Sequence, residues 1–162
     1  MLSTYPYNAL MLIAKNRKAF YEHEILEKFT AGIRLHGYEV KAVKEGRVNF
    51  DGSYVHILGH RPVVINMHIG AYSKQSQDVD ELSTRRTRQL LLTKSEIEKL
   101  TRELTQKGKT AVPLALILSK NLVKLELGIA KGRKKAEKKH LEKERQIRKD
   151  LERTVKETTR YS

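Results

Sequence analysis

The chain has 162 residues, contains no cysteine, and carries 33 Lys and Arg against 19 Asp and Glu, a formal net charge of +14. This length suits one domain, and the missing cysteines exclude a disulfide framework, a thiolate metal site and cysteine-based catalysis. So positive a surface is expected to bind a polyanion. Because the sequence shows neither a long apolar span nor a signal peptide, we predict a cytoplasmic nucleic-acid-binding protein rather than a membrane protein.

Short elements follow one another in the first third of the chain. Residues 1–15 lack a clear pattern, and we predict an irregular leader there. Apolar and polar side chains alternate in residues 20–35, for example around Ile25 and Phe29, and the alternation predicts a strand. Two glycines bracket residues 37–46, which predict a short helix that ends at the second glycine.

Two hairpins are predicted further along the chain. The β-rich runs at residues 53–58 and 62–69 are separated by a segment whose Gly59 suits a tight reversal. A second hairpin is predicted within residues 112–129, where a turn at Ser-Lys-Asn separates two runs with large apolar residues at every second position. These positions are Val112, Leu114, Leu116 and Leu118 in the first run, and Val123, Leu125, Leu127 and Ile129, alternating with Lys124 and Glu126, in the second. Pro113 lacks a backbone donor and therefore indicates an edge or a bulge.

The clearest predicted helix spans residues 94–107. Thr93 and Glu96 form a capping box at its start, and Gly108 follows its end. Several short strands with one capped helix between them fit a small antiparallel barrel better than a doubly wound α/β sheet. We therefore predict a mainly β protein with short helices, in which residues 16–130 form an OB-like antiparallel β-barrel.

The composition changes at Lys131, where a basic tail begins. Residues 131–162 hold 13 Lys and Arg against 6 Asp and Glu, so the tail carries half of the net charge. Its apolar residues are too sparse for a core, although the abundant Glu, Lys, Arg and Gln favour a helix. We predict that this tail is disordered or frayed alone and becomes helical when anions neutralise it.

Arg85, Arg86 and Arg88 stand immediately before three leucines that we expect in the core. A rigid boundary of this kind would fix the guanidinium groups, which suits phosphate recognition. An ordinary solvated run of charge is the alternative in so basic a protein. Further Lys, Arg and Asn residues in 15–18 and 41–49 strengthen the prediction of an RNA-binding face.

Metal and catalytic motifs are not predicted. His56, His60 and His68 fall in strand and turn patterns, where a spacing of four does not place two of them on one helix face. The sequence has neither a Gly-rich phosphate loop nor a nucleophile elbow. We therefore expect no metal site, no cofactor and no enzymatic activity.

Five segments in a fixed order carry a resemblance to a known family. They are Asn-Arg-Lys-Ala at 16–19, the run from Ala31 to Phe50, Ser-Tyr-Val at 53–55, Arg-Thr-Arg-Gln-Leu-Leu-Leu at 86–92 and the run from Glu126 to Lys135. From Asn16 to about Arg145, the chain thereby resembles the SsrA-binding protein family, small protein B (SmpB). Five ordered segments are far more specific than any single short motif.

The resemblance implies an RNA-binding adaptor that is not an enzyme. It implies an OB-like barrel that binds the tRNA-like domain of transfer-messenger RNA (SsrA) and delivers it, with elongation factor Tu, to stalled ribosomes. The body, as a monomer, would replace the anticodon arm. The tail would probe the empty messenger channel beyond the small-subunit decoding centre, and thereby support trans-translation.

The same resemblance implies two sets of contact residues, one for RNA on the body and one for the ribosome in the tail. The RNA-binding set is Asn16, Lys18, Gly37, Glu39, Val40, Lys41, Arg86 and Arg88. The ribosome-binding set is Lys131, Gly132, Arg133, Lys134 and Lys138. Within it, Gly132 would mark a hinge between barrel and tail, because glycine weakens a helix.

A few positions depart from the family pattern. The chain has Thr30 and Thr84 where the family commonly has Glu and Pro, and Ala136 and Ile147 where aromatic side chains are common. The absence of each aromatic stack would weaken binding by about 1 to 3 kcal/mol. The alternative function is a general basic ribosome-associated or RNA-chaperone protein. A preference for the cognate RNA over bulk tRNA separates the two functions.

Overall fold

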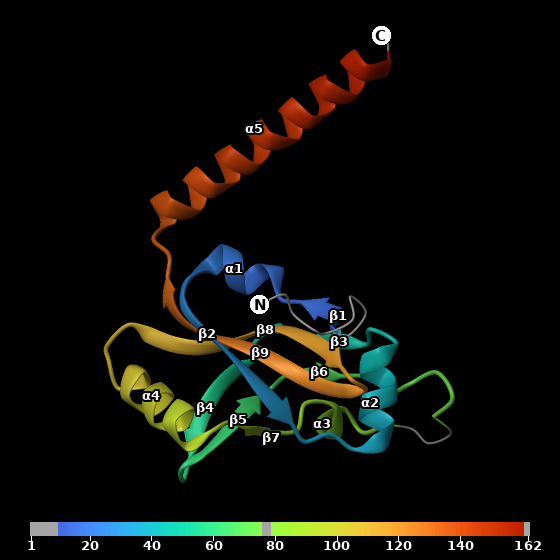
Figure 1. The fold of residues 1–162 in the computed structure, drawn as a ribbon, viewed down its shortest axis with the longest axis vertical. Coiled ribbons are helices and arrows are strands. Elements are labelled where there is room, and N and C mark those ends of the chain that lie inside the picture. Colours follow the sequence, from blue (N-terminus) through green and yellow to red (C-terminus); the bar gives the residue numbers. More distant parts are fainter. Residues whose placement is uncertain (1–9, 76–78, 161–162) are drawn as a thin grey trace, which may run out of the picture.

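The computed structural model describes residues 10–75 and 79–160. Within these ranges, a sheet of antiparallel strands wraps around a core, short helices lie around it, and one long helix leads away from it (Figure 1). The predicted mainly β architecture with short helices is confirmed.

Six of the strands form a closed ring. They are β2 (His23–Ile33), β4 (Tyr54–Leu58), β5 (Arg61–Ile65), β7 (Arg88–Leu91), β8 (Lys109–Ser119) and β9 (Leu122–Gly132). Antiparallel pairing runs in the order β8, β4, β5, β7, β2, β9, and β9 pairs back onto β8. A sheet that returns to its own first strand is a small barrel, in agreement with the OB-like prediction.

Strand β1 (Leu10–Lys15) lies outside the ring and pairs antiparallel with the second half of β8. The prediction of an irregular leader is therefore wrong for residues 10–15, and residues 1–9 lie outside the described ranges. β4 pairs with β8 only at Ala111, so the rest of that edge can accept another strand. Local patterning could not reveal β1, because its partner strand is far away in the sequence.

Both predicted hairpins are present. β4 and β5 reverse through Gly59 and His60, β8 and β9 reverse through Lys120 and Asn121, and all four turn residues have positive φ. A two-residue turn with positive φ matches the right-handed twist of the flanking strands. The register of β8 and β9 shifts next to Pro113, which confirms the predicted bulge.

The two predicted helices are also present. They are α2 (Gly37–Lys44) and α4 (Lys94–Leu104), which lie at opposite sides of the barrel in Figure 1. The capping box of α4 is confirmed, because Thr93 accepts the Glu96 N–H at 3.3 Å and donates its own N–H to the Glu96 carboxylate at 3.0 Å. A further single-turn helix, α3 (Glu81–Thr84), precedes β7.

Helix α1 (Arg17–Glu22) corrects the start of the strand that we predicted for residues 20–35. Its first turn is capped by Asn16, whose Oδ1 accepts the Ala19 N–H at 3.2 Å. The same side chain donates from Nδ2 to the Pro113 carbonyl of β8 at 2.8 Å. A helix of six residues is too short to give a periodic pattern, so the sequence alone did not reveal it.

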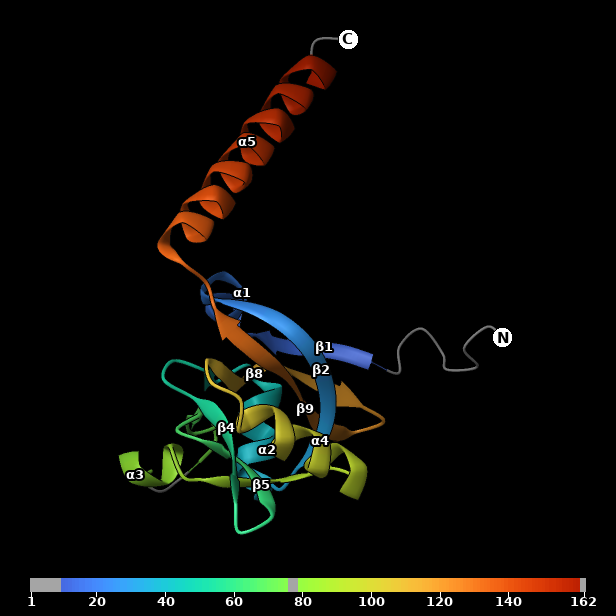
Figure 2. The ribbon, with the colours of Figure 1, turned by 90° about the vertical axis from the view of Figure 1, so that its left-hand side faces the viewer.

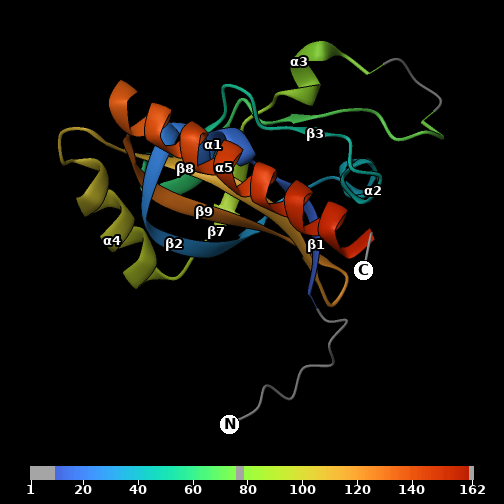
Figure 3. The same ribbon diagram turned by 90° about the horizontal axis from the view of Figure 1, so that it is seen from above.

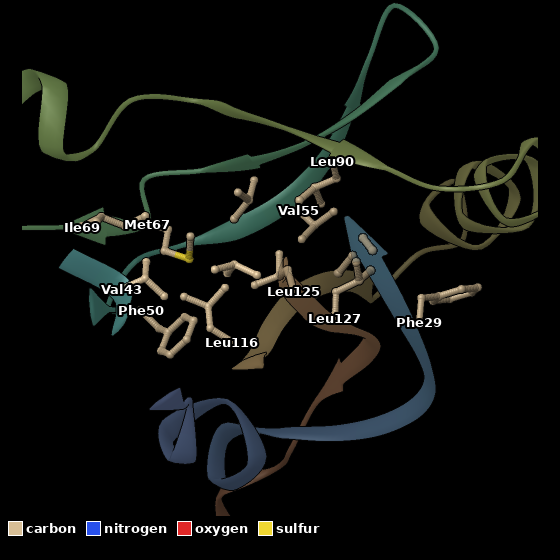
Figure 4. Close-up of a cluster of buried hydrophobic side chains, with 14 of the residues drawn as sticks. Phe29, Val43, Phe50, Val55, Met67, Ile69, Leu90, Leu116, Leu125 and Leu127 are labelled. Carbon is tan, nitrogen blue, oxygen red and sulfur yellow. The ribbon is translucent and has the colours of Figure 1, made fainter. Parts of the chain in front are cut away.

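Apolar side chains from strands and helices fill the barrel (Figure 4). Leu116, Leu125 and Leu127 extend from β8 and β9 and are fully buried. Val43 of α2 and Leu100 of α4 are buried in the same cluster. Burial of one such side chain contributes about 1.5 to 3 kcal/mol, so this cluster is a main source of the stability of the body.

A second, two-stranded sheet belongs to the region between α2 and β7. It pairs β3 (Val48–Asn49) with β6 (His68–Ile69). The side chains of Phe50 and Ile69 are buried in the barrel cluster. The small sheet is therefore held against the barrel rather than free of it.

The basic tail contains a helix, α5 (Lys135–Arg160), that leads away from the barrel (Figures 1 and 2). None of the residues of α5 is buried. The sheet reaches two residues beyond the predicted boundary at residue 130, because β9 pairs with β2 as far as Gly132. Disorder of the free tail, and folding upon neutralisation by anions, stay predictions.

Candidate nucleic-acid interface

A buried carboxylate and a buried arginine form the centre of the predicted RNA-binding region. Glu39 of α2 is 3% exposed, and Arg88 of β7 is 0% exposed. Arg88 Nε donates to Glu39 Oε2 at 2.6 Å, and its Nη groups donate to the carbonyls of Thr84 at 2.9 Å and Met67 at 2.5 Å. Every guanidinium nitrogen is used within the protein. The resemblance implies direct RNA contact for both residues; in this structure neither side chain is presented to solvent, and their contact with RNA stays a prediction.

Arg86 links this buried pair to the surface. It donates a hydrogen bond to Glu39 Oε1, which also accepts the His36 N–H at 2.9 Å. The side chain of Arg86 keeps 29% of its area exposed, so it has surface left for a ligand. It lines a groove of about 380 Å³ together with Arg34, Leu35, His36, Thr87 and Gln89.

Hydrogen bonds keep Glu39 and Arg88 ionised although both side chains are buried. Burial alone would raise the pKa of Glu39, but the hydrogen bonds from Arg86, from the His36 N–H and from Arg88 outweigh it and hold that pKa below its usual value. Burial lowers the pKa of Arg88, and the Glu39 carboxylate opposes that change. An ionised pair therefore joins α2 to β7, and removal of either partner would leave a buried charge uncompensated.

An aromatic pair stands at the start of α2, beside the groove. The rings of His36 and Tyr38 are stacked, with centroids 5.3 Å apart and planes 20° apart, and both residues are exposed. Flat exposed rings beside arginines are the surface on which unpaired bases stack. The sequence analysis missed this pair and Arg34. The segment Arg-Leu-His-Gly-Tyr at 34–38, basic and aromatic before a helix start, was the available signal.

The other predicted residues of α2 differ in their surroundings. Gly37 is exposed, and a Cβ placed there would meet nothing within 4 Å. Lys41 is exposed, and its ammonium group lies 5.1 Å from the ring centre of Tyr72. Val40 packs against the core cluster. Gly37 and Lys41 can therefore face a ligand, whereas Val40 contributes mainly to packing.

Asn16 and Lys18 belong to a different part of the surface. Asn16 caps α1 and binds the carbonyl of Pro113, so both ends of its amide are used within the protein. Lys18 is exposed and lines a groove with Asn49 and Asp51. This groove and the Arg86 groove share no lining residue, so the structure does not bring the whole predicted set together.

The predicted tail residues begin in the sheet and continue into the helix. Gly132 is opposite His23 in the β2–β9 ladder, and the Arg133 N–H donates to the Glu22 carbonyl at 2.9 Å. Gly132 is therefore not a freely rotating hinge in this structure, because its backbone belongs to the β2–β9 ladder. Lys131 and Lys134 are exposed, and Lys138 is half-buried.

The four positions that depart from the family pattern are also placed. Thr30 is exposed on β2, where it lies opposite Glu126 of β9. Thr84 is buried, and its carbonyl accepts the hydrogen bond from Arg88. Ala136 and Ile147 are exposed on α5, so an aromatic side chain at either position would be available to a partner molecule.

The fold and this surface define a class of protein: a small basic barrel with an arginine-rich groove, exposed stacked rings and a long cationic helix, as in RNA-binding proteins. No cluster of three His, Asp or Glu residues suited to a metal ion occurs in residues 10–75 and 79–160. In the same ranges, no helix combines the length and apolar character needed to cross a membrane.

Comparison with known proteins identifies the family. The profile of the SmpB protein family matches residues 13–157, and the chain belongs to that family. An SsrA-binding protein of Microcystis aeruginosa is 41% identical over 147 residues, which cover 91% of this chain and 95% of the relative. An SsrA-binding protein of Dechloromonas aromatica is 41% identical over 150 residues, or 93% of this chain and all of the relative.

A solved structure gives the same answer for the fold. It is described as "tmRNA-SmpB: a journey to the center of the bacterial ribosome", and the two chains are 38% identical with a TM-score of 0.65. The match covers 77% of this chain and 87% of the other.

Proposed function

We propose that this chain is the RNA-binding adaptor of trans-translation, which binds the tRNA-like domain of transfer-messenger RNA and brings it to stalled ribosomes. The observation that carries the proposal is the family match over residues 13–157, joined to relatives called SsrA-binding protein and to a solved tmRNA–SmpB structure. The groove and the cationic helix are surfaces of the kind that this function needs.

In this proposal, some residues contact the RNA directly and others hold those residues in position. Arg34, Arg86, the His36–Tyr38 rings and Lys41 are the exposed groups that meet the RNA, through phosphate pairing and base stacking. Glu39 and Arg88 position that surface from beneath. Lys18 adds a cationic contact from a separate groove, and the basic tail reaches into the empty messenger channel of the ribosome.

Several finer features belong to the same proposal. The body works as a monomer in the cytoplasm, it replaces the anticodon arm of the RNA, and elongation factor Tu joins it in delivery. The protein carries out no chemistry itself. Size-exclusion chromatography with light scattering checks the monomer, and co-purification from a complex charged with GTP checks the elongation factor.

The first experiment measures binding of the tRNA-like RNA domain in the presence of excess bulk tRNA. The full chain should keep its preference for the cognate RNA. Arg34→Ala should weaken binding by about ten- to a hundred-fold, because a charge-assisted contact contributes roughly 1.5 to 3 kcal/mol. Arg102→Ala is the matched control, since Arg102 is also an exposed arginine and lies on α4. Equal competition by bulk tRNA would favour a general RNA chaperone instead.

The second experiment removes residues 135–162 and leaves the whole β-ladder in place. The truncated protein should bind the tRNA-like domain within about two-fold of the full chain, because every groove residue remains. Peptide tagging on stalled ribosomes should be lost. A folded truncated barrel that no longer binds the RNA domain, or that still supports full tagging, would contradict the proposed roles of body and tail.

A further inference from the structure

The segment that follows β6 is attached to the end of α2. In Figures 1 and 3, this green segment lies on the same side of the barrel as α2. Glu45, the residue after α2, accepts the Ser73 Oγ–H at 2.7 Å and the Ser73 N–H at 3.0 Å. The hydrogen bond from the Ser73 hydroxyl, followed by that from its N–H, holds the pKa of Glu45 below its usual value. An ionised carboxylate therefore fixes the segment to the helix at Ser73.

Tyr72, the neighbour of Ser73, contacts the same turn of α2. Its ring centre lies 5.1 Å from the Lys41 ammonium group, within the range of a cation–π interaction. The Glu45 N–H donates to the Lys41 carbonyl at 3.2 Å, so Lys41 and Glu45 are one helical turn apart. Two successive residues of the segment thus meet two residues one turn apart at the end of α2.

The ring of Tyr72 is held in place from several directions. Tyr72 packs against the core cluster, and its carbonyl accepts the Gln75 N–H at 3.0 Å. On the other side, the Gly70 N–H donates to the Arg47 carbonyl at 2.9 Å. Packing and the hydrogen bonds at Gly70, Ser73 and Gln75 therefore fix the ring without help from a ligand.

The position of Lys41 depends on the ring rather than on a carboxylate. A lysine and a glutamate four residues apart can form an ion pair, but in residues 10–75 and 79–160 Glu45 pairs with Arg47 at 2.9 Å and not with Lys41. A ring leaves the ammonium charge available to an anion, whereas a carboxylate would neutralise it. A lysine that is already restrained also loses less rotamer freedom when it binds a phosphate. The contact with Tyr72 therefore prepares Lys41 for an anionic ligand.

We propose that Glu45 and Tyr72 are positioning residues for RNA binding. Glu45 holds Ser73, Ser73 fixes the neighbouring Tyr72, and the ring of Tyr72 orients the Lys41 ammonium group. Lys41 meets the RNA, and the other three residues act through it. The inference rests on the proposed function, in which Lys41 is one of the groups that contact the RNA.

The first test uses the free full chain and needs no RNA. In NMR spectra, the ring current of Tyr72 should shift the Lys41 Hε protons upfield of those of other exposed lysines. Tyr72→Leu should abolish this shift while it keeps an apolar side chain against the core. Ser73→Ala removes the 2.7 Å hydrogen bond, and Glu45→Gln removes the charge that accepts it. Both should move the Lys41 signal toward that of an exposed lysine.

Two matched substitutions serve as controls for the NMR test. Ser95→Ala removes an exposed hydroxyl from α4, and Glu24→Gln neutralises an exposed carboxylate on β2. Neither should change the Lys41 signal. A wild-type Lys41 signal that lies with those of the other lysines, or equal effects of the test and control substitutions, would overturn the proposal.

The second test measures binding of the tRNA-like RNA domain in a double-mutant cycle. Tyr72→Leu should weaken binding by about two- to five-fold, which corresponds to the free energy of an exposed cation–π interaction. In a Lys41→Ala background, the same substitution should have almost no effect, because the ring acts through the lysine. In an Arg34→Ala background, its full effect should remain.

The two tests separate this inference from the proposed function. Equal effects of Tyr72→Leu with and without Lys41, in a protein that binds the RNA domain, would overturn the positioning role and leave the function intact. Failure of the wild type to bind the RNA domain, with the Lys41 shift present, would refute the function and with it the positioning role.

Discussion

Arg86 and Arg88 are two positions apart in the sequence, and the structure gives them different tasks. The side chains of both reach Glu39, but Arg88 is enclosed and Arg86 remains partly at the surface. The neighbouring Arg85 pairs with Glu81 at 3.7 Å, on α3. The three arginines look alike in the sequence but differ in the structure. Arg88 is buried and binds Glu39, Arg86 lines a groove, and Arg85 forms a surface ion pair.

Removal of Arg88 should therefore be costly to the fold. We expect Arg88→Ala to lower the free energy of unfolding by about 3 to 5 kcal/mol, because Glu39 would remain as an uncompensated buried charge. The matched substitution Arg47→Ala breaks an exposed pair with Glu45 and should cost less than about 1 kcal/mol. Urea denaturation followed by circular dichroism measures both. Similar losses in the two variants would contradict the supporting role.

The Glu39 carboxylate also predicts a dependence of stability on pH. Its pKa is lower in the folded protein than in the unfolded chain, so its contribution is complete above the unfolded pKa and is lost as pH falls through the folded one. Glu39→Gln should be much less stable than the wild type at neutral pH. The gap should narrow below roughly pH 4. Denaturation midpoints of the two proteins between pH 3 and 7 provide the measurement. A difference in stability that stays constant over this range would contradict the prediction.

At the residue scale, the sequence indicates which side chains interact better than it indicates which of them are exposed to solvent. The resemblance singled out Glu39, Arg86 and Arg88, and the structure brings those three together. It could not tell which of them faces solvent, because burial of Arg88 depends on the carbonyls of Met67 and Thr84, contributed by backbone outside β7. The His36–Tyr38 pair was missed because stacking depends on the turn into α2.

At the scale of elements, β9 lies in close contact with both β2 and β8 at Gly128. A Cβ on Gly128 would come within 2.9 Å of side-chain atoms of Ile25 and Leu114, and within 3.3 Å of the Glu27 carbonyl. The register of β2 shifts at this same place, between Ile25 and Glu27. Glycine at this position thus allows three strands to approach closely.

Substitution of this glycine should loosen the barrel. We expect Gly128→Ala to cost about 1 to 3 kcal/mol, because overpacking forces neighbouring side chains and backbone to move. Gly132→Ala is the matched control on the same strand, since a Cβ there would meet nothing within 4 Å, and its effect should be small. Thermal unfolding compares the two variants. Equal melting temperatures would show that the contact is relieved without cost.

Elements with local signals were predicted and those without them were not. The capping box at Thr93, the turn at Gly59 and the bulge at Pro113 each depend on neighbours in the sequence, and each is confirmed. α1 and β1 depend instead on distant parts of the chain. Asn16 anchors α1 to β8, and β1 exists because β8 has a vacant stretch of edge.

At the scale of the whole molecule, the net positive charge is shared equally between residues 1–130 and the basic tail of residues 131–162, most of which forms the exposed helix α5. For the body, we expect binding of the tRNA-like domain to weaken with salt at a log–log slope of roughly −4 to −5, as about six phosphate contacts imply. Removal of residues 135–162 should leave that slope within about one unit. A slope that falls by half would place the tail, rather than the groove, on this RNA.

Strand β9 gives the molecule a mechanical property. It leads directly into the tail, and it is hydrogen-bonded to β2 along one edge and to β8 along the other over nearly its whole length. A pull on α5 along the direction of β9 would load both ladders in shear, so many hydrogen bonds would have to break at once. The barrel should therefore resist unfolding when a force is applied to the C-terminal helix.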